Sequence, residues 1–230
     1  VYNNNALYVF VSQTGTSKLM IQAANKLKEL NIDTVALSSD LNSPLVNNCT
    51  CVIELCIGYE EYSYATLGFT CSMLTEMLMG LEIGLLNKHL NEEEYDKYIE
   101  EIKLTPDSNY ETITRTVSWF ELMKDKLSKV ENFIIYGGSS LYGVATEGAL
   151  KIMEITKKYV SVGYEMDDGM HGPNYCLDER TAVFALNDGK DNKNAIGIDH
   201  TPIFIFLDAD FILLSYSLRN FSALDFNSEF

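Results

Sequence analysis

Basic residues are scarce in this chain. Of its 230 residues, 17 are Lys or Arg and 33 are Asp or Glu, which gives a formal net charge of −16. A charge of this sign repels the phosphodiester backbone of nucleic acids and anionic membrane surfaces. The sequence therefore predicts no nucleic-acid partner and no membrane partner. Any phosphate group that the protein binds must be held locally, by backbone N–H groups and hydroxyls.

Long apolar runs and paired cysteines are also missing. No uninterrupted apolar stretch reaches the roughly 18 residues of a membrane-spanning helix, and no signal-peptide pattern is visible. The five cysteines are an odd number, scattered along the chain. This usage is typical of a reducing compartment, so we expect a cytoplasmic protein.

The sequence offers little for a metal or a dinucleotide. Three cysteines fall between residues 49 and 56, but they lie in an apolar run that predicts a buried strand, which favours core cysteines over zinc ligands. The pair Gly137-Gly138 lacks the third glycine and the later acidic residue of a dinucleotide fingerprint. The three histidines have no paired ligand spacing: His89, His171 and His200. We therefore expect no metal and no cofactor.

Strand-like and helix-like patterns alternate along the chain, which predicts an α/β fold with parallel sheets flanked by helices. The expected strands are 6–12, 34–37, 51–56, 133–136, 159–164, 181–186 and 201–207. The expected helices are 17–30, a long and buried 66–86, a charged 92–103, 110–127 after a break at Pro106, 145–157, and a short 210–218. We predict two flavodoxin-like modules with three αβα layers, residues 1–88 and 129–230, joined by a helical linker at 89–128.

Both modules look abbreviated. The chain opens at Val1 without Met and is in a predicted strand by Ala6, so we expect the first part of the first module to be missing. After Asn187 the sequence is too short for a full helix, strand and helix. We expect ordered pieces to be joined there, near residue 198 or 218, and the second module to be incomplete.

The segment Ser12 to Ser17 (SQTGTS) contains four hydroxyl side chains between a predicted strand and a predicted helix. Such a turn presents free N–H groups and the positive end of the helix dipole, which can hold a phosphate without Lys or Arg. An ordinary capping turn has the same composition. The position after a strand favours the phosphate site, because ligands of doubly wound sheets bind at the carboxyl ends of strands.

This segment resembles the phosphate loop of the sugar isomerase (SIS) family, with Thr16 in place of the usual Glu. A second stretch, Gly58 to Thr70, is similar to the segment that leads into the long helix of the isomerase domain of glucosamine-6-phosphate synthase, with Leu67 in place of the usual Lys. A third, Glu147 to Glu154 followed by His171-Gly172-Pro173, resembles the second SIS module of that synthase and of fructosamine-6-phosphate deglycases.

The resemblance implies a site for a sugar phosphate. Phosphate and sugar contacts would come from Ser12, Gln13, Thr14, Gly15, Ser17 and the backbone near Ser63. The remaining roles fall on the third stretch, where Glu147, Lys151 and Glu154 share one helix face.

Spacing alone would make that face a solvated ion-pair ladder. The resemblance instead implies that Glu154 moves a proton between C1 and C2 of the sugar and that Lys151 holds the carboxylates in place. His171, otherwise a surface loop histidine, would act on the ring oxygen or a departing amine. Because this histidine acts across a subunit interface in the family, a homodimer or higher homo-oligomer is implied.

Two elements of the synthase are absent from this sequence: a glutaminase domain and a lysine near the C-terminus. The sequence therefore predicts a deglycase or an aldose–ketose isomerase/deaminase that acts on an amino sugar phosphate or fructosamine 6-phosphate. The alternative is a non-catalytic sugar-phosphate sensor or regulatory subunit.

Overall fold

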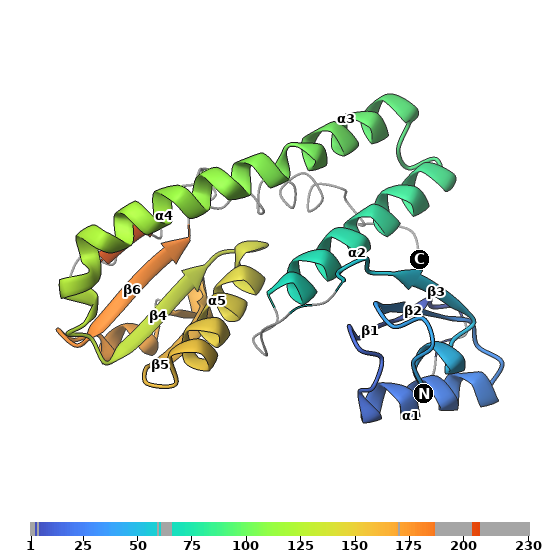
Figure 1. Cartoon of the computed structure of the whole chain (residues 1–230), viewed down its shortest axis with the longest axis horizontal. Helices are drawn as coiled ribbons and strands as arrows, with labels where there is room; N and C mark the ends of the chain where they lie inside the picture. The colour runs from blue at the N-terminus through green and yellow to red at the C-terminus, as the bar shows by residue number, and fades with distance from the viewer. Residues whose placement is uncertain are drawn as a thin grey trace. The chain divides into compact units, whose positions relative to one another are not determined.

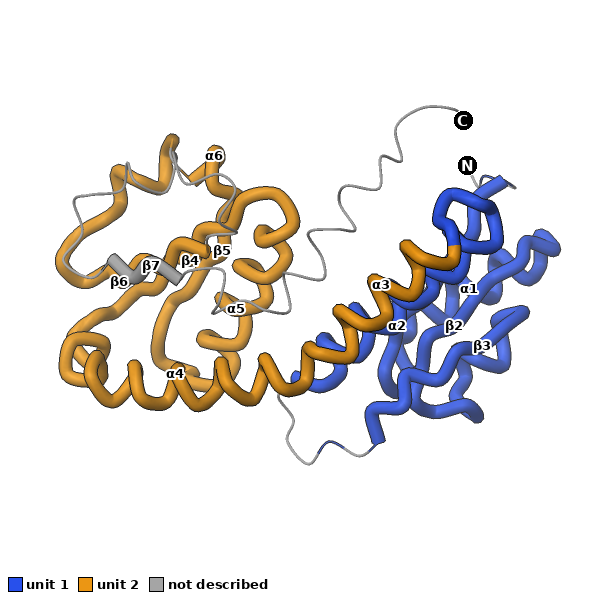
Figure 2. The backbone as a smooth tube through the Cα atoms, turned by 90° about the horizontal axis from the view of Figure 1, so that it is seen from above, with its two compact units in different colours: residues 1–91 blue, residues 92–230 orange. Residues whose placement is uncertain are grey.

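The structure, a computed structural model, describes residues 3, 5–58, 60, 66–169, 171–186 and 204–207, the last four by their backbone alone. The chain divides into two compact units, residues 1–91 and 92–230 (Figure 2). Each of them contains its own parallel sheet. An α/β fold with parallel sheets and flanking helices is therefore confirmed.

The first unit alternates strands and helices (Figure 1). Its elements are β1 (Tyr8–Val11), α1 (Lys18–Glu29), β2 (Thr34–Ser38), the short 3-10 helix η1 (Val46–Asn48), β3 (Cys51–Glu54) and α2 (Leu67–Leu86). The strands pair in the order β1-β2-β3, all parallel. The carboxyl ends of the three strands therefore lie along one edge of this sheet.

Helices pack on both faces of this sheet. On one face, Ala24 of α1 packs with Ala36 and Leu45. On the other, Leu37 packs with Leu55 and Ile57, and Cys71 of α2 lies against this cluster. Ala36 and Leu37, which are neighbours on β2, thus belong to the hydrophobic clusters on opposite faces of the sheet, as expected for a strand covered on both sides.

The second unit begins with two helices and continues with a second parallel sheet. Its elements are α3 (Glu92–Lys103), α4 (Thr105–Leu127), β4 (Asn132–Gly137), α5 (Leu141–Thr156), β5 (Val160–Glu165), α6 (Met166–Gly169), the short 3-10 helix η2 (Pro173–Cys176), β6 (Thr181–Leu186) and β7 (Phe204–Leu207). The strand order is β5-β4-β6-β7, with all pairs parallel. Numbered within the unit this is 2-1-3-4, the order of flavodoxin-type doubly wound sheets.

Different segments cover the two faces of the second sheet. Ala145 and Ala149 of α5 pack against Ile135, and the C-terminal half of α4 covers the same face through Trp119 and Met123. On the opposite face, the described covering comes from residues 166–169 and 171–177, including Met166 and Leu177, which pack around Tyr136.

Most predicted elements are present, with boundaries that differ by a few residues. The predicted break between the two helices is present but lies at Leu104 and not at Pro106: α3 ends at Lys103, and α4 starts at Thr105 with Pro106 in its first turn. Proline is tolerated there because first-turn N–H groups have no intrahelical acceptor. The predicted helix 210–218 and the predicted joins near 198 and 218 lie outside the described residues.

Two predictions of burial are wrong. Every residue of β3 is exposed, since β3 is the outer strand of the described sheet, and Cys51 and Cys56 are exposed thiols. Helix α2 is apolar around its whole circumference, yet within the helix only Gly68 and Leu81 are buried. By length and composition alone, α2 is also apolar enough to cross a membrane, although no uninterrupted apolar run marks it in the sequence.

Candidate functional site

The loop of residues 12–17 turns from the carboxyl end of β1 into α1, and Gly15 gives it its shape. Gly15 has φ +62°, in the left-handed region that favours glycine. A Cβ placed there would lie 2.4 Å from the Cβ of Ser43. The loop is tied to its surroundings by backbone bonds from Leu45 N to Gly15 O at 3.1 Å and from Ser39 N to Gln13 O at 2.9 Å. Its conformation is therefore fixed without a ligand.

The helix end that follows this loop is open. Ser17 occupies the N-cap of α1, but no side chain in the described part of the protein caps this end, and the first turn contains no acidic residue. The amides of the first turn therefore face outward with the positive end of the helix dipole.

Hydroxyl groups line the same turn. Ser12, which is 8% exposed, has its Oγ 3.2 Å from the Oγ of Ser17. The Oγ1 atoms of Thr14 and Thr16 lie 2.8 Å apart, and both residues are exposed. In each pair one hydroxyl donates to the other, which leaves the second hydroxyl with its proton free for an anion, so the turn supplies neutral donors for a phosphate.

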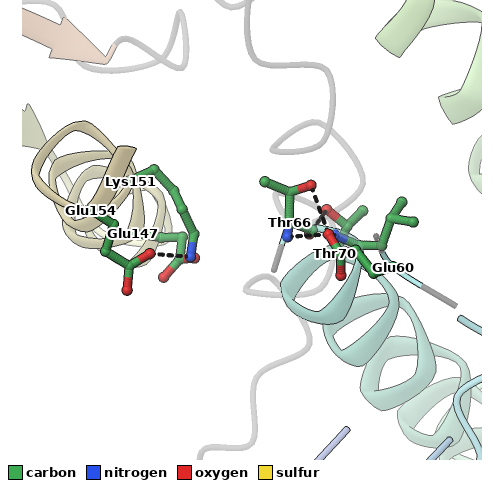
Figure 3. A network of polar contacts seen from close by, with 7 residues as sticks. Glu60, Thr66, Thr70, Glu147, Lys151 and Glu154 are labelled. Carbon is green, nitrogen blue, oxygen red and sulfur yellow. Dashed lines mark hydrogen bonds and ion pairs between the residues drawn. The ribbon is translucent and has the colours of Figure 1, made fainter. Parts of the chain in front are cut away.

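The N-terminus of α2, in the same unit, is capped by the carboxylate of Glu60 (Figure 3). Oε1 of Glu60 accepts hydrogen bonds from Thr66 N at 2.7 Å, Leu67 N at 3.1 Å and Thr66 Oγ1 at 3.2 Å. The bond from Thr66 N, with smaller contributions from Leu67 and from the Gln13 side chain, holds the pKa of Glu60 below its usual range. Of the two long helices in this unit, α2 therefore has its N-terminus occupied, while that of α1 is available for an anion.

Two residues that the sequence prediction missed lie next to the phosphate loop. The Gln13 side chain is one of the groups that lower the pKa of Glu60, and Ser39 donates its N–H to the Gln13 carbonyl. The other carboxylate oxygen of Glu60 and the Oγ of Ser39 are buried and have no hydrogen-bond partner among the described residues. Ser39 could have been suspected from its position directly after β2. Nothing local in the sequence indicates that Glu60 reaches Gln13.

The three charged residues predicted on one helix face do form a cluster on α5 (Figure 3). Lys151 Nζ lies 2.8 Å from Glu154 Oε2 and 3.3 Å from Glu147 Oε1. The side chain of Lys151 is 21% exposed and that of Glu154 is 37% exposed. The hydrogen bond to Glu154, followed by the bond and charge of Glu147, raises the pKa of Lys151. One cation thus fixes two carboxylates, and Glu154 remains reachable from solvent.

His171 is exposed and lies in the segment between α6 and η2, after the carboxyl end of β5. Glu154 lies in the last turn of α5. The rise of 1.5 Å per residue puts it about 20 Å along the axis from the start of that helix. Helix α5 starts after the carboxyl end of β4 and ends before the start of β5. Glu154 therefore lies near the amino ends of the strands, whereas His171 lies beyond their carboxyl ends. Within one chain, the structure does not bring these two residues together.

The structure describes all of the predicted phosphate- and sugar-binding residues except one. It gathers Ser12, Gln13, Thr14, Gly15 and Ser17 in one turn, whereas Ser63 lies outside the described residues. Among the described residues, no group of three His, Cys, Asp or Glu side chains could hold a metal ion.

Known proteins resemble this chain both in sequence and in structure. The SIS domain family matches residues 2–81. Glutamine–fructose-6-phosphate aminotransferase [isomerizing] from Fusobacterium nucleatum is 28% identical over 155 residues, which is 67% of this chain and 25% of that protein. The enzyme of the same name from Bordetella pertussis is 24% identical over 91% of this chain and 35% of its own length. The chain thus spans about a third or less of the curated relatives it matches.

Solved structures agree on the fold. A candidate phosphosugar isomerase from Clostridium difficile aligns with a TM-score of 0.83 and 26% identity, over 90% of this chain and 60% of that one. The C-terminal domain of glucosamine-fructose-6-phosphate aminotransferase from Francisella tularensis aligns with a TM-score of 0.79 and 21% identity, over 95% and 72%. The resemblance of this chain to the SIS family, and to the isomerase part of the glutamine–fructose-6-phosphate aminotransferases, is thereby confirmed.

Proposed function

We propose that this protein is an enzyme that binds an amino sugar phosphate or a fructosamine 6-phosphate and moves a proton between C1 and C2 of the sugar. The observation that supports it most is the loop of residues 12–17. It joins a preformed left-handed turn, hydroxyl donors and an open helix N-terminus at the carboxyl edge of a parallel sheet, where doubly wound proteins bind their ligands.

The phosphate would be held by neutral groups. The amides at the start of α1 and the hydroxyls of Ser12, Thr14 and Ser17 supply donors, and Gln13 contributes from the same loop. Neutral donors suit a protein with a net charge of −16, because the attraction is confined to the site.

Glu154 would then act as the base on the sugar. It takes the proton from C1 of an open-chain ketose phosphate to give an enediol and returns it to C2. A positioned acid–base group of this kind contributes about 10²–10⁴-fold to the rate. Lys151, bonded to Glu154 at 2.8 Å, fixes the carboxylate rather than touching the reacting carbons.

His171 would open the sugar ring or protonate a departing amine, since imidazole changes charge near neutral pH. Within one chain, His171 lies beyond the carboxyl ends of the strands, and Glu154 lies near their amino ends. This arrangement supports a homodimer in which the two groups of one site come from different copies. We propose that each unit is one SIS module and that the protein acts in the cytoplasm.

The test begins with binding. Isothermal titration of fructose 6-phosphate, glucosamine 6-phosphate and a fructosamine 6-phosphate should identify a ligand, and a turnover assay follows for each ligand that binds. Glu154→Gln should bind that ligand with the affinity of the wild-type protein and lose about 10²-fold or more in turnover. Wild-type turnover in this variant removes the proposed base. Binding without turnover in the wild-type protein makes the chain a sensor.

A further inference from the structure

A single buried phenol holds the segment that contains His171 at two points. Tyr136 is the last residue but one of β4 and is 0% exposed. Its hydroxyl lies 3.1 Å from Oδ1 of Asn174 and 3.4 Å from the carbonyl oxygen of Gly169. Both are acceptors, so the phenol donates its single proton mainly to the nearer Asn174 and more weakly to Gly169; these two acceptors lie on either side of His171 in the sequence.

The packing around the ring fixes the same segment. A Cβ at Gly169 would fall 2.0 Å from a ring carbon of Tyr136, so the backbone of residue 169 lies directly against the phenol. Leu177, just beyond η2, packs on the cluster that contains Tyr136. The beginning and the end of the segment 169–177 are therefore both anchored on one side chain of the sheet.

Local backbone bonds complete the segment. His171 N donates to Asp168 O at 3.3 Å, and Tyr175 N donates to Gly172 O at 3.1 Å. These two turns connect His171 to the anchored residues on each side. The imidazole itself is exposed, so its position depends on the backbone that holds it.

We infer that Tyr136 is a positioning residue for His171: its hydroxyl and ring hold the backbone at Gly169 and the side chain of Asn174, and so fix where the imidazole between them is presented to substrate. Tyr136 does not touch the sugar. This inference rests on the proposed role of His171, but the anchoring itself can be measured without activity.

The first experiment measures amide hydrogen exchange of residues 169–176 by mass spectrometry. Tyr136→Phe keeps the ring and removes the hydroxyl. Loss of one buried hydrogen bond should speed exchange in this segment by roughly 2- to 10-fold and leave α5 unchanged. The matched control is Tyr164→Phe, since Tyr164 packs on the same cluster but its hydroxyl makes no bond to the described residues. Unchanged exchange at 169–176 in Tyr136→Phe overturns the inference.

A double-mutant cycle identifies the partner. Asn174→Ala removes the nearer acceptor and should speed exchange to a similar extent, while the double variant Tyr136→Phe with Asn174→Ala should exchange little faster than either alone. Additive effects would mean that the two residues act separately. If Tyr136→Phe does not fold, Asn174→Ala alone decides: wild-type exchange in that variant overturns the inference.

Kinetics then connect the anchor to the reaction. In Tyr136→Phe, kcat should fall roughly 2- to 10-fold with KM unchanged. Added to His171→Ala, the same substitution should cause no further loss. A further loss in that background would mean that Tyr136 acts elsewhere. Wild-type turnover in His171→Ala alone would refute the proposed role of His171 and leave the exchange result standing.

Discussion

Gly15 is the residue whose replacement should damage the phosphate loop most, for two separable reasons. Its φ of +62° costs an alanine about 1–2 kcal/mol. The added Cβ would also lie 2.0 Å from Oγ and 2.4 Å from Cβ of Ser43, which is itself buried. Overpacking of this kind typically costs about 1–3 kcal/mol more. We expect Gly15→Ala to lose about 2–5 kcal/mol of folding free energy in the first unit.

Gly58 provides the matched control. It has φ +69°, but an added Cβ there would meet no atom of the described residues within 4 Å. Gly58→Ala should therefore cost only the backbone part, partly offset because alanine also restricts the unfolded chain by about 0.4–1 kcal/mol. The difference between the two variants isolates the contact with Ser43.

Urea unfolding followed by far-UV circular dichroism measures both variants. Trp119, the one tryptophan of the chain, lies in the second unit, so its fluorescence monitors that unit as an internal reference. The variant Gly15→Ala with Ser43→Gly should recover part of the loss, because it removes the clashing atoms. Equal losses for Gly15→Ala and Gly58→Ala would refute the packing argument.

Three further perturbations test the other parts of the account. Glu60→Gln should weaken sugar-phosphate binding, measured by titration calorimetry, because the Glu60 carboxylate holds the amides of Thr66 and Leu67 at the start of α2; stronger binding would mean that Glu60 acts only as a repelling charge. Lys151→Met should change the unfolding free energy by less than about 1 kcal/mol, as is usual for partly exposed ion pairs, yet reduce kcat strongly; unchanged kcat would make the cluster an ion-pair ladder. Burial raises the pKa of Tyr136 to about 12. The unfolded chain therefore releases this proton first, and urea unfolding at pH 9 to 12 should show a loss of stability between pH 10 and 12 that is smaller in Tyr136→Phe. Identical pH dependence in both proteins would contradict the assigned burial.

The fold could be predicted largely because its signals are local. Apolar runs bounded by turns located β2, β4 and β6, helical periodicity located α1, and a charged segment located α3. The errors arose where tertiary context decides. β3 has the apolar composition of a central strand but lies at the edge of the described sheet, and the start of α4 at Thr105 depends on the tolerance of a helix for Pro106 in its first turn.

The candidate site also contains parts that the sequence predicts and parts that it does not. Residues 12–17 are contiguous, so their motif could be recognised in the sequence, and the spacing of Glu147, Lys151 and Glu154 predicted a shared helix face. The contact of Glu60 with Gln13 joins residues 47 positions apart, and that of Tyr136 with Asn174 joins residues 38 apart. Contacts of this range depend on how strands and loops pack, and no sequence pattern in a single chain reveals them.

The measurement that tests the central claim most directly is a crystal structure of the protein with a bound hexose 6-phosphate. The account predicts that the phosphate lies against the amides at the start of α1 and within hydrogen-bond distance of hydroxyls from Ser12, Thr14 or Ser17. A phosphate bound elsewhere, with residues 12–17 unoccupied at a saturating ligand concentration, would contradict it.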